Sequence, residues 1–121
     1  MSPSTSVLVI GCGGIGERHL RCFQKTGRAS VIACDADAGR RERMAATYGV
    51  PVAADANAAI AGGDVTGVVI CTPAHTHVPL ARAALSAAFE REAALLALRA
   101  AARADDAAVA ALLRAAASAR D

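Results

Sequence analysis

The sequence has very few aromatic residues and a single lysine. Aromatics make up 2% of its 121 residues, tryptophan is absent, and Lys25 is the only lysine. Hydrophobic residues make up 55%, so a core can still form, but it must consist of valine, isoleucine, leucine and alanine. The formal net charge of +2 is spread along the chain without a basic block, which argues against nucleic acid or an anionic membrane as a partner.

Signals for secretion, membrane insertion and structural metal are also lacking. The four cysteines form no C-x-x-C pair, so neither a zinc knuckle nor a thioredoxin-like motif is indicated. The N-terminal segment has no cationic region before its first short apolar run, which is untypical of a signal peptide. No segment reaches the length of a membrane span. We therefore expect a cytoplasmic protein with free thiols and no metal.

The order of apolar runs predicts the fold. Short, continuously apolar runs at residues 7–10, 31–34, 50–53 and 68–71 suit parallel strands that are covered on both faces. Helices are expected at about 14–25, 37–48 and 55–60, and from about residue 77 onward. This alternation predicts an α/β protein of one main domain, a partial doubly wound Rossmann fold with about four parallel strands in the order 3-2-1-4. In the first helix, Ile15, His19 (or Leu20) and Phe23 are expected on one side.

The composition changes after residue 88. Residues 89–121 contain neither glycine nor proline and show no strand signal. We therefore predict an α/β domain over 1–88 and an alanine-rich helical tail of two helices over 89–121. Leu85, Phe89, Ala93, Leu96 and Ala100 fall on one face of the first helix, and Asp105 or Asp106 can cap the second. Such a tail could support self-association or the docking of a partner.

A glycine-rich turn follows the first predicted strand and opens the first helix. It reads Gly11-Cys12-Gly13-Gly14-Ile15-Gly16, a G-x-G-x-x-G pattern in its required context. In this motif Gly11 makes the tight turn, Gly13 lets backbone N–H groups approach a pyrophosphate, and Gly16 lets the helix pack on the strand. The helix N-terminus adds unpaired donors and partial positive charge. The predicted cofactor-binding residues here are Gly11, Gly13, Gly14, Ile15 and Gly16.

An acidic residue stands where this motif needs one. Asp35 lies nineteen residues after Gly16, at the end of the second predicted strand, where a carboxylate can accept hydrogen bonds from both adenosine ribose hydroxyls. It would repel a 2′-phosphate, which favours NAD over NADP, although Arg40 and Arg41 follow closely. Two alternatives stay open: a purely structural turn with Asp35 capping the next helix, and an S-adenosylmethionine site of the methyltransferase kind.

A second polar turn follows the fourth strand, at Cys71-Thr72-Pro73-Ala74-His75-Thr76-His77. Ligands of open α/β sheets bind at the carboxyl ends of the strands, so Thr72, Pro73, His75 and His77 can line the nicotinamide side of a cleft. The plainer interpretation is a proline-stopped strand with Thr76 or His77 capping the next helix. A metal site at Cys71, His75 and His77 lacks a fourth ligand at a familiar spacing. Cys12 is either a stabilised thiolate or a small apolar residue in a tight turn.

These motifs together resemble the N-terminal half of the Gfo/Idh/MocA family, named after glucose–fructose oxidoreductase and inositol dehydrogenase. The resemblance covers roughly residues 1–88 and rests on the glycine turn, Asp35 and the Thr-Pro-x-His-x-His turn. It implies that the glycine loop, Asp35 and Thr72 bind NAD(P), and that Pro73 and His77 shape the nicotinamide side. Family members act on sugars and polyols. They often carry asparagine where Ala74 stands.

The resemblance stops at the alanine-rich tail. Family members continue into a fifth strand that ends in Glu-Lys-Pro, whereas this sequence continues as Phe89-Glu90-Arg91-Glu92. The family's lysine and its substrate domain, with the catalytic histidine, have no counterpart here, so no catalytic residue is assigned. We expect the NAD(P)-binding part of an oxidoreductase that does not turn over alone. The alternatives are a non-catalytic nucleotide-binding module and a truncated or frame-shifted product.

Overall fold

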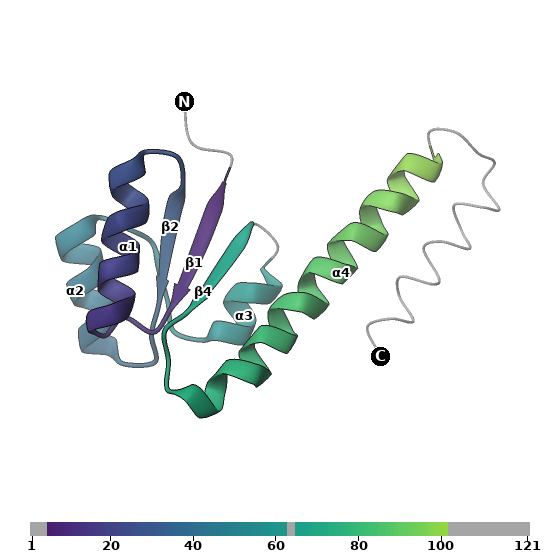
Figure 1. Cartoon of the computed structure of the whole chain (residues 1–121). Coiled ribbons are helices and arrows are strands. Elements are labelled where there is room, and N and C mark those ends of the chain that lie inside the picture. Colours follow the sequence, from purple (N-terminus) through teal and green to yellow (C-terminus); the bar gives the residue numbers. More distant parts are fainter. Residues whose placement is uncertain (1–4, 63–64, 102–121) are drawn as a thin grey trace. The chain divides into compact units, whose positions relative to one another are not determined.

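The structure is a computed structural model, and it describes residues 5–62 and 65–101 (Figure 1). The chain divides into two compact units, residues 1–84 and 85–121, which are described separately. The elements, in chain order, are β1 (Ser6–Ile10), α1 (Gly14–Thr26), β2 (Ser30–Cys34), α2 (Ala38–Tyr48), β3 (Val52–Ala53), α3 (Ala56–Ala61), β4 (Gly67–Ile70), a short 3-10 turn (Ala74–Thr76) and α4 (His77–Ala101).

The four strands form one parallel sheet. Their order is β3-β2-β1-β4, so the central strand β1 pairs with β2 on one side and with β4 on the other. Val9 of β1, for example, lies between Ala33 of β2 and Val69 of β4. This arrangement confirms the predicted α/β class and the order 3-2-1-4. Because all strands run in the same direction, the turns that follow β1, β2 and β4 meet at one edge of the sheet.

The sheet is covered on both faces, as its continuously apolar strands predict. Val7 and Val9 of β1 join a buried cluster with Leu20 of α1 and Met44 of α2. Leu8 of β1 points to the opposite face because side chains alternate along a strand, and α3 packs against β1. Figure 1 shows α1 and α2 on one side of the strands and α3 on the other.

Capping residues begin and end the helices where the sequence indicates. The Asp37 carboxylate accepts the Arg40 N–H at 2.9 Å and caps α2, and the Asp55 carboxylate accepts the Ala58 N–H at 3.1 Å and caps α3. Gly27 and Gly49 end α1 and α2, each at a φ of +66°, in the left-handed region that glycine adopts without steric cost.

Two local predictions need correction. The inner face of α1 carries Gly16 and Leu20, the alternative given for His19, and Phe23 packs against the core as predicted, whereas Ile15 is 62% exposed and His19 is also exposed. The close approach of Gly16 to the turn after β1 fixes the rotation of the helix, and it turns residue 15 outward. The third strand is also shorter than 50–53, because Pro51 has no N–H to donate, although its carbonyl still accepts the Ala33 N–H at 3.0 Å.

Of the second unit, the structure describes only residues 85–101, which belong to α4. α4 continues without a break past residue 88, and Leu85 and Phe89 are 71% and 63% exposed. The predicted second helix, beginning at Asp105 or Asp106, lies outside the described residues, and the division into 1–88 and 89–121 stays a prediction. Within the described residues, no helix combines the length and the apolar character that a membrane span requires.

Replacing Gly16 with alanine tests the tight contact at the start of α1. A Cβ at Gly16 would lie 1.7 Å from the Gly11 carbonyl oxygen, so the backbone must shift. We expect Gly16→Ala to lower the free energy of unfolding by about 3 kcal/mol or more, as measured by urea denaturation. Gly62→Ala is the matched control, because Gly62 has helical φ and ψ and room for a methyl group. Equal stabilities for the two variants would contradict this packing.

Candidate functional site

A cleft of about 590 Å³ opens at the carboxyl edge of the sheet. It is lined from the ends of β1 and β2 and from the segments that follow β1, β2, β3 and β4. The lining residues are Ile10, Gly11, Gly13, Cys34, Asp35, Ala36, Arg40, Ala54, Ala56, Cys71, Thr72, Pro73, His75, Thr76, Pro79 and Leu80. Its volume and mostly apolar lining suit a small molecule or cofactor.

Two glycines of the loop after β1 are required by backbone conformation and close packing. Gly11 has a φ of +92°, and a Cβ there would lie 2.8 Å from the Cys71 carbonyl carbon and oxygen. Gly16 allows α1 to approach the Gly11 carbonyl. These two positions therefore join the turn after β1 to α1 and to the turn after β4, which confirms their structural part in the motif.

Gly13 is different, because none of the described residues packs closely enough to require a glycine there. Its φ of −73° and ψ of −164° are open to any residue, and a Cβ would find no atom within 4 Å. Gly13 lines the cleft and precedes the first turn of α1, whose leading N–H groups have no acceptor within the helix. Free space beside unpaired donors fits a phosphate group that approaches the backbone.

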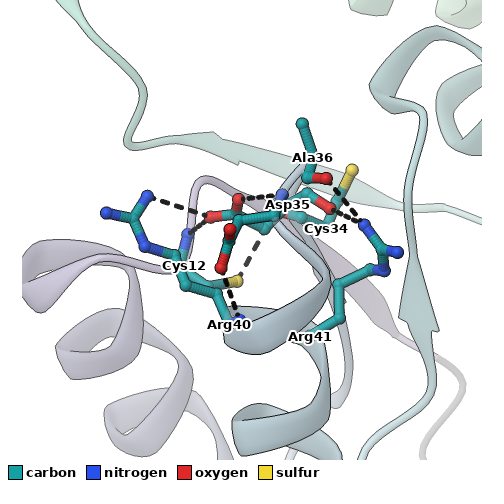
Figure 2. A network of polar contacts seen from close by, with 7 residues as sticks. Cys12, Cys34, Asp35, Ala36, Arg40 and Arg41 are labelled. Carbon is teal, nitrogen blue, oxygen red and sulfur yellow. Dashed lines mark hydrogen bonds and ion pairs between the residues drawn. The ribbon is translucent and has the colours of Figure 1, made fainter.

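Asp35 ties the end of β2 to the glycine loop (Figure 2). Its Oδ2 accepts the Cys12 N–H at 2.8 Å, and its Oδ1 accepts the Asp37 N–H at 2.8 Å. The residue is only 8% exposed, yet it lines the cleft. The cap of α2 is Asp37, so the alternative in which Asp35 caps that helix is wrong. Asp35 is instead a fixed acceptor that faces the cleft.

The carboxyl group of Asp35 is held in its charged form. Burial disfavours that form, but the hydrogen bonds from the N–H groups of Asp37 and Cys12 and the nearby Arg40 guanidinium outweigh it. The pKa of Asp35 is therefore lowered from its ordinary value of 3.8. A charged, anchored carboxylate accepts hydrogen bonds from hydroxyl groups and repels a phosphate.

The two neighbouring arginines have different surroundings. The Arg41 guanidinium donates to the carbonyl oxygens of Asp35 and Ala36, both at 2.9 Å, and so holds the turn between β2 and α2. The Arg40 guanidinium lies 3.7 Å from Asp35 Oδ2, lines the cleft and is 58% exposed. Only Arg40 can therefore bear on a ligand in the cleft.

The turn after β4 is held by hydroxyl groups. The Thr76 hydroxyl donates to the Pro73 carbonyl at 2.6 Å, and its oxygen lies 2.5 Å from the Thr72 hydroxyl oxygen. Because the single proton of Thr76 goes to Pro73, Thr72 is the donor in this pair and keeps a free lone pair. Thr72, Pro73 and Thr76 line the cleft, and the structure thus gives Thr76 a part that the sequence does not signal.

The two histidines of this turn lie in different places. His75 lines the cleft, whereas a ring nitrogen of His77 lies 2.7 Å from the Thr72 carbonyl oxygen and His77 is not part of the lining. His77 therefore contacts the backbone of Thr72 and does not itself line the cleft, although the sequence predicted that it would. In the part of the chain that the structure describes, no group of three or more histidine, cysteine or acidic residues is arranged to hold a metal ion.

Cys12 is a buried thiol. Burial raises its pKa to about 11, and the charge of Asp35 acts in the same direction. The Cys12 thiol donates weakly to the Cys34 carbonyl at 3.5 Å. Burial first, and the charge of Asp35 second, thus favour the neutral thiol, which supports the interpretation of Cys12 as a small apolar residue in a tight turn over that of a stabilised thiolate.

A parallel sheet in the order 3-2-1-4, a glycine loop before α1 and an acid after β2 together define the Rossmann class of dinucleotide-binding domains. Residues 5–90 match the oxidoreductase family with an NAD-binding Rossmann fold, GFO_IDH_MocA. The chain belongs to this family, and it carries the family's NAD-binding domain. The family match decides against the methyltransferase alternative.

Similar proteins include two inositol 2-dehydrogenases. The one from Arthrobacter sp. (strain FB24) is 34% identical over 89 residues, which is 71% of this chain and 26% of the relative. The one from Pseudarthrobacter chlorophenolicus is 34% identical over 80 residues, which is 64% of this chain and 24% of the relative. The chain therefore spans about a quarter of the length of these relatives.

A solved structure has the same fold. The WlbA dehydrogenase from Chromobacterium violaceum, determined in complex with NADH and UDP-GlcNAcA, superimposes with a TM-score of 0.59 at 23% sequence identity. The match covers 66% of this chain and 24% of that protein. It confirms the fold of the first unit.

The pH dependence of stability tests the environment of Asp35. Its lowered folded-state pKa contributes stability that is fully present above pH 3.8 and is lost as the pH falls through the folded-state value. We expect Asp35→Asn to remove this part of the acid-induced loss and to lower the free energy of unfolding at pH 7 by about 1–3 kcal/mol. The measurement is urea denaturation between pH 7 and 2.5. Glu42→Gln, which removes an exposed carboxyl group from α2, is the control. The same acid slope in wild type and Asp35→Asn would contradict the assignment.

Thiol labelling tests the burial of Cys12. We expect iodoacetamide at pH 8 to modify the exposed Cys22 first, while Cys12 and Cys34 react only on unfolding, since both are buried and have raised pKa values. Mass spectrometry of peptides from the partly labelled protein measures the order. Modification of Cys12 as fast as Cys22 would show that the glycine loop is open to solvent.

Proposed function

We propose that this chain binds NAD(H) along the cleft at the carboxyl edge of the sheet, with its adenosine end at Asp35 and its nicotinamide end at the turn after β4. The single observation that carries the proposal is the pairing of an anchored carboxylate with the open space at Gly13. Both groups line one cleft: no described atom lies within 4 Å of a Cβ position at Gly13, and the anchored Asp35 carboxylate faces the same space.

The adenosine ribose is assigned to Asp35. The carboxylate oxygens already accept one backbone N–H each, which fixes their direction, and each retains a lone pair for a ribose hydroxyl. The low pKa of Asp35 keeps both oxygens as acceptors at neutral pH. This arrangement supports NAD(H) as the preferred cofactor over NADP(H).

The pyrophosphate is assigned to the glycine loop and the first turn of α1. Gly13 leaves room for the phosphates, and Gly14, Ile15 and Gly16 contribute backbone N–H groups at the positive end of the helix. Gly11 and Gly16 support the site through the fold. The 62% exposure of Ile15 leaves its side chain at the rim, so its part in binding falls to its backbone.

The nicotinamide side is assigned to Thr72 and Pro73, with His77 holding the Thr72 carbonyl in place. The bound cofactor would supply hydride chemistry, and the residues of this turn would orient its ring. Because two similar proteins are inositol 2-dehydrogenases, the CH–OH group of a polyol is the proposed substrate class of a protein that contains this domain.

Binding without turnover is the proposed behaviour of the chain by itself. Hydride transfer requires a substrate held against the nicotinamide and a group that exchanges a proton. The only lysine, Lys25, lies in the last turn of α1, at the end of that helix remote from the glycine loop. We also propose a cytoplasmic location, because the four cysteines are free thiols and so suit a reducing compartment.

Titration with NADH, followed by its fluorescence, tests the proposal. We expect saturable binding to the wild type and loss of binding in Gly13→Val, because a valine side chain fills the space assigned to the pyrophosphate. The fold tolerates this change, since Gly13 has extended backbone angles and no neighbouring atom at its Cβ position. The unfolding midpoint of Gly13→Val therefore stays near that of the wild type.

Gly62→Ala, remote from the cleft lining, serves as the binding control. No binding to the wild type at millimolar NADH would overturn the proposed function. Undiminished binding to Gly13→Val would leave the function standing but contradict the part given to the glycine loop.

A further inference from the structure

One face of α4 carries most of the large apolar side chains that the described residues leave exposed. Val78, Leu85 and Phe89 are 62%, 71% and 63% exposed. All three belong to one uninterrupted helix (Figure 1), and helical spacing alone places them within about 40° of one another around its axis. Leu80, which lines the cleft, lies about 200° from Val78 on the same helix. α4 thus presents an apolar stripe that the described residues leave largely uncovered.

Two charged residues lie on the same stripe, Arg82 and Glu92. Both are exposed, and neither side chain forms an ion pair with another described residue. With Val78, Leu85 and Phe89 they follow the alternating spacing of four and three residues that is typical of a coiled-coil seam. A charged residue in such a seam weakens it unless the facing helix supplies the opposite charge. The stripe therefore fits a partner helix with a glutamate and an arginine at matching positions.

We propose that α4 pairs with α4 of a second copy of this chain, in antiparallel orientation about a two-fold axis near Ala87. In this register Leu85 of each copy lies opposite Phe89 of the other, and Arg82 of each copy lies opposite Glu92 of the other. Because the axis is two-fold, each contact forms twice. The stripe is thus complementary to itself, with apolar pairs in the middle and one ion pair on either side.

The charges and the flanking residues both favour this arrangement. In a parallel pair Arg82 would face Arg82 and Glu92 would face Glu92, and like charges in contact oppose association. The antiparallel pair also sets the two helix dipoles against each other. The residues that flank the seam are small and let the helices approach closely: Ala81, Ser86, Ala88 and Ala93. The proposal does not depend on NAD(H), since the stripe and Leu80 lie on different faces of α4.

Sedimentation velocity of the full chain, over about a hundredfold range of concentration, tests the proposal. We expect a reversible equilibrium between monomer and dimer. Arg82→Glu places two carboxylates opposite each other at both ends of the seam, so we expect the dimerisation affinity to fall about tenfold or more. Glu92→Arg should have the same effect through paired arginines. The double variant Arg82→Glu/Glu92→Arg rebuilds both ion pairs in reverse, and we expect it to return to within about threefold of the wild type.

Arg28→Glu is the matched control, because it makes the same change of charge in the exposed turn between α1 and β2 and should leave dimerisation unchanged. The substituted side chains are exposed, so the helix content by circular dichroism should stay constant. A chain that remains monomeric at every concentration would overturn the proposal. A dimer that the single charge reversals weaken but the double variant does not restore would also overturn it. So would a monomer that Phe89→Ser destabilises, because the stripe would then be covered within one chain.

Discussion

The Asp35 carboxylate joins the two turns on which the site depends. It accepts the N–H of Cys12 from the loop after β1 and the N–H of Asp37 from the turn after β2, each at 2.8 Å. Both N–H groups lie just beyond the end of a strand, where the backbone no longer forms hydrogen bonds with a neighbouring strand. The carboxylate accepts these hydrogen bonds instead. The hydrogen bonds outweigh the burial of the charge and keep the pKa of Asp35 low. One side chain thereby orders the glycine loop, fixes the distance between two strand ends and presents an acceptor to the cleft.

The glycines of the loop after β1 fall into two groups, those that the fold requires and one that it does not. Gly11 and Gly16 meet each other and the turn at Cys71 so closely that a Cβ at either position would displace backbone. Gly13 has no such neighbour among the described residues, so packing does not account for a glycine there. Two glycines of the motif thus serve packing, and the family match over residues 5–90 supports a dinucleotide as the proposed occupant of the space at Gly13.

Much of the fold follows from the sequence, because short apolar runs alternating with helical segments leave few arrangements of a parallel sheet. The glycine loop and Asp35 were predictable because their chemistry requires fixed positions beside strand ends. The rotation of α1 was not, since it depends on the contact of Gly16 with Gly11, which the apolar periodicity does not record. The different surroundings of Arg40 and Arg41 also escape the sequence, as neighbouring side chains on a helix point in different directions. The assignments to Thr72, Pro73 and His77 remain predictions, although the network around Thr72 supports them.

In the proposed function, one dinucleotide spans the glycine loop and Asp35. Amide NMR spectra of the full chain during a titration with NADH test it most directly, because each N–H reports its own surroundings. We expect saturable shifts at Gly13 and Ile15, which would face the proposed pyrophosphate, and at Cys12 and Asp37, which donate to Asp35. Gly27 and Gly49, in the turns that end α1 and α2, should keep their positions. Binding that leaves the amide signals of Gly13 and Asp37 unshifted would contradict the proposed position of the dinucleotide.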